Sequence, residues 1–90
     1  MMRLIQRIHY EEISKMQELE RVALTQDLPE HGLKIGDVGM ILHIYADHQG
    51  YEVEFVTLSG ELIVLVSVYP AQIRQLERDE IASARRVKTT

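Results

Sequence analysis

Three β-rich runs follow one another closely between residues 38 and 69, and they constrain the fold more than any other feature. In the run YEVEFVTL (51–58), a tyrosine, a valine and a phenylalanine alternate with two glutamates, which is the period of a half-buried strand. VGMILHIYA (38–46) precedes it across the turn DHQG, and ELIVLVSVY (61–69) follows it across the hairpin signal Ser59-Gly60. Short strands at this regular spacing predict an antiparallel β-domain.

The sequence on either side of these runs completes the predicted fold. LERVALTQ (19–26) predicts a first strand and AQIRQLE (71–77) a short turn with a last strand. Between the first two strands lies DLPEHGLKIGDVG (27–39), whose proline and three glycines predict a long loop with positive-φ positions. We therefore expect a mainly β fold, a small SH3-like five-stranded barrel over residues 18–76, in which closure removes the open sheet edges.

The two flanks are predicted to differ from the barrel. Residues 1–17 form a helical N-terminal extension, because Leu4, Ile5 and Ile8 fall on one face of a helix spanning residues 3–15. Residues 77–90 form a short C-terminal helix or tail, whose basic residues are interpreted as a solvated end. These basic residues are Arg85, Arg86 and Lys88.

Composition excludes several classes of chemistry. The 90 residues include no cysteine, so disulfides, thiolate metal sites and cysteine nucleophiles are ruled out, and a reducing cytoplasm is the expected location. No apolar run approaches the length of a membrane span. We expect a cytoplasmic protein without a membrane partner.

Charge is distributed unevenly along the chain. Between Val22 and Pro70 there are one lysine and seven acidic residues, a formal charge of −6, whereas the flanks together carry nine basic and seven acidic residues, or +2. Nucleic-acid binding depends on Lys and Arg that neutralise phosphates, so a barrel with one lysine is an unlikely nucleic-acid binder. An acidic surface instead favours a basic protein partner.

The run at residues 61–69 is apolar on both faces, which is unusual for a strand at a barrel surface. Leu62, Val64, Val66 and Val68 are expected to face the core. The second face is expected to need a cover, either the chain's own flanks, including Ile81, or a partner chain, and both remain open. The predicted partner-binding residues on this surface are Ile41, Val56, Ile63, Leu65 and Tyr69, with the acidic Glu52 and Glu54.

At each candidate catalytic or metal site, a structural interpretation is favoured over a catalytic one. His43, Asp47 and His48 surround one turn but supply at most a pair of ligands with one acid, so exposed polar residues are favoured over a metal site. Glu52 and Glu54 lie about 6.5–7 Å apart along a strand, and a solvated face is favoured over acid–base catalysis. The glycines of the 27–39 loop lack the Gly-Lys-Ser/Thr ending and the helix of a phosphate loop. No catalytic residue, metal, cofactor or small-molecule substrate is expected.

The segments DLPEHGLKIGDVGMILHIY, YEVEFVTLSGE and QIRQLERDEIASARR resemble a family of small bacterial proteins, often cyanobacterial, that is recorded as a domain of unknown function. The likeness covers roughly residues 18–86, and its signature reads LPxxGLKxGDxG followed by YxVEF. The chain is also similar to KOW-type and nitrile-hydratase-β-like SH3 barrels. The resemblance implies an SH3-like barrel. It also implies an antitoxin or immunity role, since such proteins are often encoded beside toxin-like or nuclease-like neighbours.

The predicted function is therefore a non-catalytic protein-interaction module, an antitoxin- or immunity-type protein that neutralises a small toxin or nuclease partner. The alternative is an accessory or structural subunit of a larger enzyme or ribonucleoprotein assembly, and a homo-oligomer is compatible with either function. The identity of the neighbouring gene would separate the two: a toxin-like gene favours the first and a metabolic operon the second.

Overall fold

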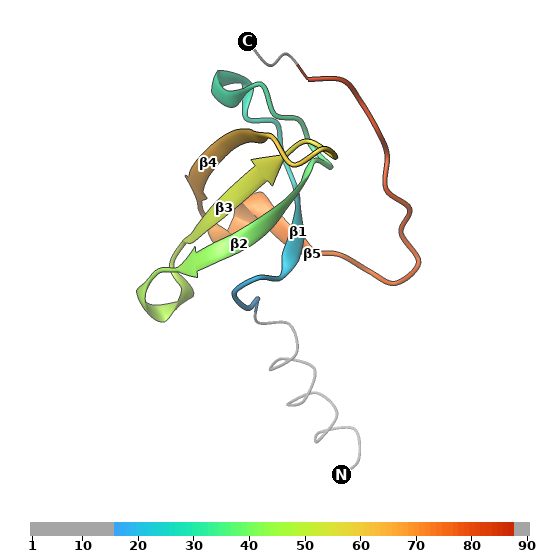
Figure 1. Cartoon of the computed structure of the whole chain (residues 1–90). Coiled ribbons are helices and arrows are strands. Elements are labelled where there is room, and N and C mark those ends of the chain that lie inside the picture. The colour runs from blue at the N-terminus through green and yellow to red at the C-terminus, as the bar shows by residue number, and fades with distance from the viewer. Residues whose placement is uncertain (1–15, 88–90) are drawn as a thin grey trace.

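The computed structural model describes residues 16–87, which form one five-stranded antiparallel sheet (Figure 1). Its strands are β1 (Arg21–Leu24), β2 (Val38–Ile44), β3 (Tyr51–Val56), β4 (Leu62–Val68) and β5 (Ile73–Gln75). The spatial order is β4-β3-β2-β1-β5, so β1 joins the β2–β4 meander to the short last strand. Single 3-10 turns, η1 (Pro29–His31), η2 (Ala46–His48) and η3 (Pro70–Gln72), lie in the connections.

The sheet curls but does not close. In the described residues β4 pairs only with β3 and β5 only with β1, so β4 and β5 are the two edges of an open sheet. The prediction of a mainly β, five-stranded domain is confirmed, whereas the prediction of a closed barrel is wrong. The physical reason is that β5 has only three residues, all of which pair with β1.

The core lies on the inner side of the curled sheet. On β3, Tyr51, Val53 and Phe55 are buried, as the alternation predicts, while the two intervening glutamates are only half-buried. Residues from all five strands and from the first loop complete this core. Its members are Val22, Leu24, Leu28, Leu33, Ile41, Tyr51, Val53, Phe55, Val68 and Ile73.

Two irregularities in strand pairing change which side chains face the core. On β2 the register shifts between Ile41 and His43, so Leu42 is an extra residue. On β4 the partners of Phe55 and Val56 are Val64 and Leu62, which leaves Ile63 as an extra residue. Such β-bulges break the simple period of two and redirect the side chains that follow.

The segment after β5 contains no helix in the part of the chain that the structure describes. Residues 76–87, here called the tail, run without regular secondary structure along the side of the sheet toward the β1–β2 loop (Figure 1). Of the predicted C-terminal helix or tail, the helix is therefore wrong for these residues and the tail is observed. Ile81, in the middle of the tail, is 93% exposed, so a helix here would gain little packing to offset its ordering cost.

The predicted N-terminal helix at residues 3–15 lies outside the described residues. Of the extension over residues 1–17, Met16 and Gln17 are described; both are non-helical, and Met16 packs against the core. In the described part of the chain, no helix has the length and apolar character needed to cross a membrane.

Candidate functional site

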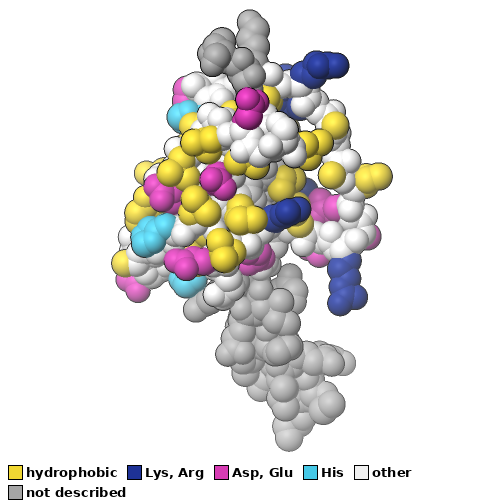
Figure 2. All heavy atoms as spheres, in the orientation of Figure 1, with side chains coloured by type: hydrophobic (Ala, Val, Ile, Leu, Met, Phe, Trp, Pro, Cys, Tyr) yellow, Lys and Arg dark blue, Asp and Glu magenta, His cyan; other side chains and the backbone are white. Residues whose placement is uncertain are grey.

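The solvent side of the sheet carries an apolar surface, here called the outer face. Figure 2 shows hydrophobic side chains gathered over β2, β3 and β4 with acidic side chains among them. Four of these apolar residues are between 41% and 60% exposed, and the other two are more covered. The outer face consists of Val38, Met40, Leu42, Val56, Leu62 and Leu65.

Strand register brings these residues together. Met40 of β2 lies opposite Glu54 of β3, and Glu54 lies opposite Leu65 of β4, so one glutamate sits between two apolar side chains. In the next row toward the β3–β4 hairpin, Val56 pairs with Leu62. The outer face is therefore continuous across three strands, and its carboxylate is flanked by hydrocarbon.

Glu52 occupies the adjoining row, between His43 of β2 and Ser67 of β4. Both Glu52 and Glu54 are half-buried, and no ion pair involves either of them in the described residues. Because neither carboxylate is neutralised by an ion pair among the described residues, both add negative potential to the apolar surface.

Of the seven predicted partner-binding residues, four lie together on the outer side of the sheet and three do not. Val56, Leu65, Glu52 and Glu54 lie together on the outer face, as expected. Ile63 is the extra residue of the β4 bulge and is half-buried against the core, and Tyr69 lies beyond the end of β4, 73% exposed.

The expectation that Ile41 lies on this face is wrong. Its side chain is fully buried, because it pairs with the inward-facing Val53. Sequence reasoning also missed four outer-face residues: Val38, Met40, Leu42 and Leu62. Once Gly39 is known to face inward, Val38 and Met40 can be assigned to the outer face, because the neighbours of an inward-facing residue in a strand point outward.

The histidines of the β2–β3 turn do not converge on a common point. His43 contacts Tyr45 edge-on at 5.0 Å between ring centroids, whereas His48 contacts Tyr51 edge-on at 6.2 Å. Both Asp47 and His48 have positive φ values. Across residues 16–87 no three His, Cys, Asp or Glu side chains are grouped so that they could hold a metal ion.

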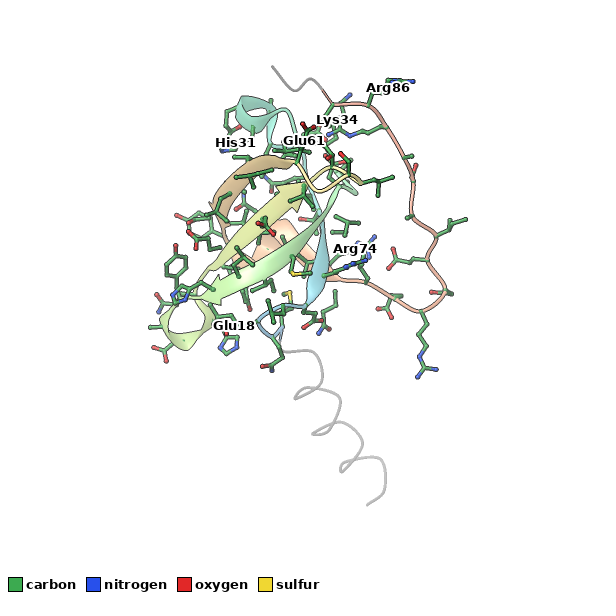
Figure 3. The ribbon with its side chains drawn as sticks, in the orientation of Figure 1. Glu18, His31, Lys34, Glu61, Arg74 and Arg86 are labelled. Carbon is green, nitrogen blue, oxygen red and sulfur yellow. The ribbon has the colours of Figure 1, made fainter. Side chains whose placement is uncertain are left out.

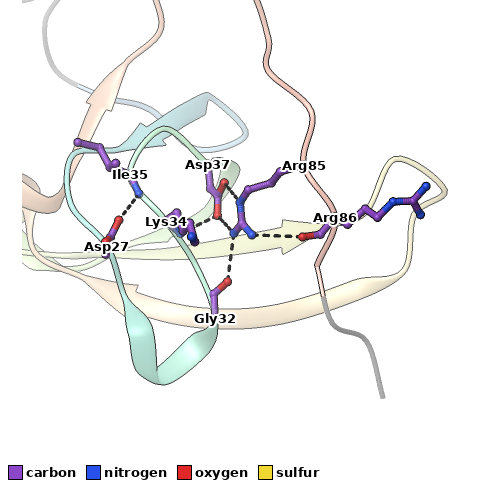
Figure 4. A network of polar contacts seen from close by, with 7 residues as sticks. All are labelled: Asp27, Gly32, Lys34, Ile35, Asp37, Arg85 and Arg86. Carbon is purple, nitrogen blue, oxygen red and sulfur yellow. Dashed lines mark hydrogen bonds and ion pairs between the residues drawn. The ribbon is translucent and has the colours of Figure 1, made fainter.

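The 27–39 loop has a second polar arrangement that joins it to the tail (Figure 4). Arg85 donates from Nε to Oδ1 of Asp37 at 2.9 Å, and from Nη2 to Oδ2 of Asp37 and to the Gly32 carbonyl oxygen, the last at 3.1 Å. The prediction of a solvated end is thus wrong for Arg85. For Arg86 it agrees with Figure 3, which shows that side chain extending away from the tail.

The loop holds Asp37 in place by its own hydrogen bonds. The Lys34 amide donates to Oδ2 of Asp37 at 2.8 Å, and the Ile35 amide donates to Oδ1 of Asp27 at 2.8 Å. Partial burial, the largest single influence, raises the pKa of Asp37, but the hydrogen bonds from Arg85 and Lys34 and their charges outweigh it. The pKa of Asp37 therefore lies below its ordinary value, and the carboxylate is ionised at neutral pH.

A groove of about 660 Å³ lies between the tail and the body. The body contributes the loop around Asp37, the β3–β4 hairpin and the end of the outer face, and the tail contributes residues 82–87. Its apolar lining on the body side comes from Leu33, Val38, Val56, Leu58 and Ile63. The groove and the outer face therefore adjoin at Val38 and Val56.

Residues 18–75 match the sequence model of a family described as a domain of unknown function, DUF4926. The chain belongs to this family. The match spans all five strands and ends at Gln75, so the tail that carries Arg85 lies outside it. No curated protein and no solved structure matches the chain. The family resemblance expected from the sequence is thus confirmed as a domain-of-unknown-function family, while the bacterial origin and the signature stay predictions.

Proposed function

We propose that this protein is a non-catalytic protein-interaction module that neutralises a small toxin or nuclease, as an antitoxin or immunity protein does. The observation that supports the proposal most directly is the outer face, a continuous apolar surface across β2, β3 and β4. Exposed apolar surface of this extent usually marks an interaction site. Among the described residues only the tail approaches this face, at its Val38 and Val56 end.

The charge of the module favours a basic partner. The segment between residues 22 and 70 carries a formal charge of −6, and two of its acidic residues, Glu52 and Glu54, lie beside the apolar residues of the outer face. Nucleases and other nucleic-acid-directed toxins carry basic surfaces, because they bind phosphates. An acidic inhibitor accelerates its encounter with such a partner and occupies the same basic surface.

The strand arrangement supports an SH3-like assignment in an opened form. A long first loop, a β2–β4 meander and a short last strand returning to β1 are the expected parts of that plan. The open edge at β4 distinguishes this sheet from a closed barrel.

The test is partner capture followed by inhibition. The full chain, affinity-tagged, is used to purify partners from its native host, and the partner's nuclease activity is then measured with and without the full chain. We expect stoichiometric inhibition, and we expect Leu65→Lys to abolish it, because the lysine replaces apolar contact surface at the centre of the outer face and adds a positive charge that repels a basic partner. Ile81→Lys is the matched control, since Ile81 is equally apolar but lies off the outer face.

Recovery of only other copies of the chain would contradict the proposal. Capture of a metabolic enzyme or a ribonucleoprotein whose activity is unchanged by the chain would instead favour the accessory-subunit alternative.

A further inference from the structure

The Asp37 carboxylate and the Gly32 carbonyl oxygen form a preorganised acceptor site, here called the Asp37 socket (Figure 4). The Lys34 amide fixes the carboxylate, and Gly32, at φ 70°, ends the η1 turn with its own amide bonded to Pro29. None of these bonds involves the tail. The socket therefore keeps its geometry when Arg85 leaves.

The tail that fills the socket is held weakly. Every residue from Leu76 to Arg86 is exposed. Within the described chain, its ion pairs are Arg74–Glu80 near its start and Asp37–Arg85 near its end. Ion pairs near the protein surface contribute little to stability, so the tail can be displaced at small cost.

Displacing the tail would uncover the apolar body side of the groove. Leu58 at the hairpin is fully exposed, and Val38 and Val56 continue into the outer face. An incoming extended segment would thus find hydrocarbon beside the socket.

We propose that the Asp37 socket and the adjoining groove bind an arginine on an extended segment of a basic protein partner, and that Arg85 occupies the socket as an intramolecular competitor in the free protein. The observed seating of Arg85 shows which side chain the socket fits. A planar guanidinium satisfies both carboxylate oxygens and the Gly32 carbonyl at once, which a lysine ammonium does not reproduce. Asp27 and Glu30 in the same loop add negative charge.

This inference deepens the proposed function, and rests on it for the basic partner, but the binding site can be tested without that partner. The probe is a synthetic peptide with the sequence of residues 81–90, IASARRVKTT, titrated into the full-length 15N-labelled Arg85→Ala variant. Amide shifts at Gly32, Lys34 and Asp37 report binding. We expect a Kd on the order of 0.1 mM. Because the tethered tail competes at an effective concentration on the order of a millimolar, apparent binding to the wild-type chain should be about tenfold weaker.

Three controls test whether the peptide binds at Asp37 and whether it binds through its arginine. Asp37→Asn in the Arg85→Ala background keeps an acceptor for the Lys34 amide but should lower peptide affinity at least about tenfold, since the charged bidentate pair is lost. Glu30→Gln removes one charge from the same loop and should change the affinity less than about twofold. A peptide with lysine in place of the arginine at residue 85 should bind several-fold more weakly.

Folded Arg85→Ala protein that does not bind the peptide would overturn the inference, as would equal binding by the wild type or insensitivity to Asp37→Asn. Arg85→Gln provides a second vacated socket if the alanine variant misfolds. Any of these failures leaves inhibition through the outer face untouched. Conversely, if the capture experiment contradicts the proposed function, peptide binding at the socket is unaffected.

Discussion

Gly39 of β2 lies so close to Val53 of β3 that a Cβ atom at residue 39 would be 2.6 Å from Cγ1 of Val53. The same Cβ would lie 2.9 Å from Cε1 of Phe55 and 2.9 Å from the carbonyl oxygen of Glu54. Gly39 thus lets two strands and the largest core side chain approach at the point where the first loop enters the sheet. It is the one glycine of the GDVG element that is required for its lack of a side chain and not for its backbone angle.

Gly39→Ala is expected to destabilise the protein by roughly 1–3 kcal/mol, the usual cost of overpacking a core. The carbonyl oxygen of Glu54 cannot move away without shifting β3, so relaxation is limited. Urea unfolding followed by circular dichroism measures the change. Gly36→Asn is the matched control: Gly36 has φ +90° but open space around it, and asparagine tolerates positive φ, so its cost should stay below about 1 kcal/mol.

The assignment of the two sheet faces predicts different losses of stability when side chains are truncated on β2 and on β4, the two strands that flank β3. Ile41→Ala removes a fully buried side chain and should cost about 2–5 kcal/mol. Leu65→Ala, at a site that is 45% exposed, should change stability by about 0.5 kcal/mol or less. Equal losses in urea unfolding would show that Leu65 is covered in solution, for example by a second copy of the chain.

How far the sequence determined this fold can be argued from particular residues. The strict alternation in residues 51–56 correctly predicted which side chains of β3 enter the core, because a regular strand repeats every two residues. The same rule misplaced Leu62, because the β4 bulge at Ile63 interrupts the period of two. Ile41 precedes the β2 bulge and was assigned to the wrong face of β2. A bulge is set by pairing with a distant strand, and a single strand's sequence does not reveal it.

In the candidate site, too, local patterns could be predicted from the sequence and long-range contacts could not. Glu52, Glu54, Val56 and Leu65 were predictable, since their pattern lies within two strands joined by a tight hairpin. The Asp37–Arg85 pair was not, because its members are 48 residues apart and the tail has no periodic pattern that fixes its path. A basic residue in a terminal segment is interpreted as solvated unless the position of its acidic partner in the fold is known.

The turn at the start of the tail yields a prediction about a single pKa. Arg74 donates from Nη1 and Nη2 to the two carboxylate oxygens of Glu80 at 2.8 and 2.7 Å, and the Glu77 amide donates to Oε2 at 2.6 Å. The Arg74 hydrogen bonds, followed by that of Glu77, lower the pKa of Glu80 from 4.5 to about 2. Carboxyl 13C shifts followed through an acid titration should therefore show that Glu80 takes up its proton near pH 2, well below the ordinary value of 4.5.

Arg74→Ala should raise the pKa of Glu80 toward 4.5, while Arg78→Ala, which removes a nearby arginine outside this network, should leave it near 2. Because the folded pKa is depressed, any stability that this pair contributes is fully present above pH 4.5 and is lost as the pH falls through about 2. A pKa near 4.5 in the wild type would mean that the turn is not formed in solution.

Acid should release the far end of the tail through Asp37. The pKa of Asp37 in the folded protein lies below its ordinary 3.8, so the unfolded chain takes up the proton first as the pH falls. The contribution of the Asp37–Arg85 pair is therefore present above pH 3.8 and lost as the pH falls through the lower, folded pKa. Steady-state 15N–1H NOE values for residues 81–87 measure this release directly.

We expect wild-type NOE values in the tail to be high at neutral pH and to decrease on acidification below pH 3.8, before the sheet amides lose their dispersion. In Asp37→Asn the guanidinium loses its charged partner, so the tail should be mobile already at neutral pH and show no acid transition of its own. Glu61→Gln controls for a general loss of negative charge, since Glu61 lies in the β3–β4 hairpin and forms no ion pair with the described tail. A tail that stays ordered in Asp37→Asn would show that the groove lining, and not the ion pair, holds it against the body.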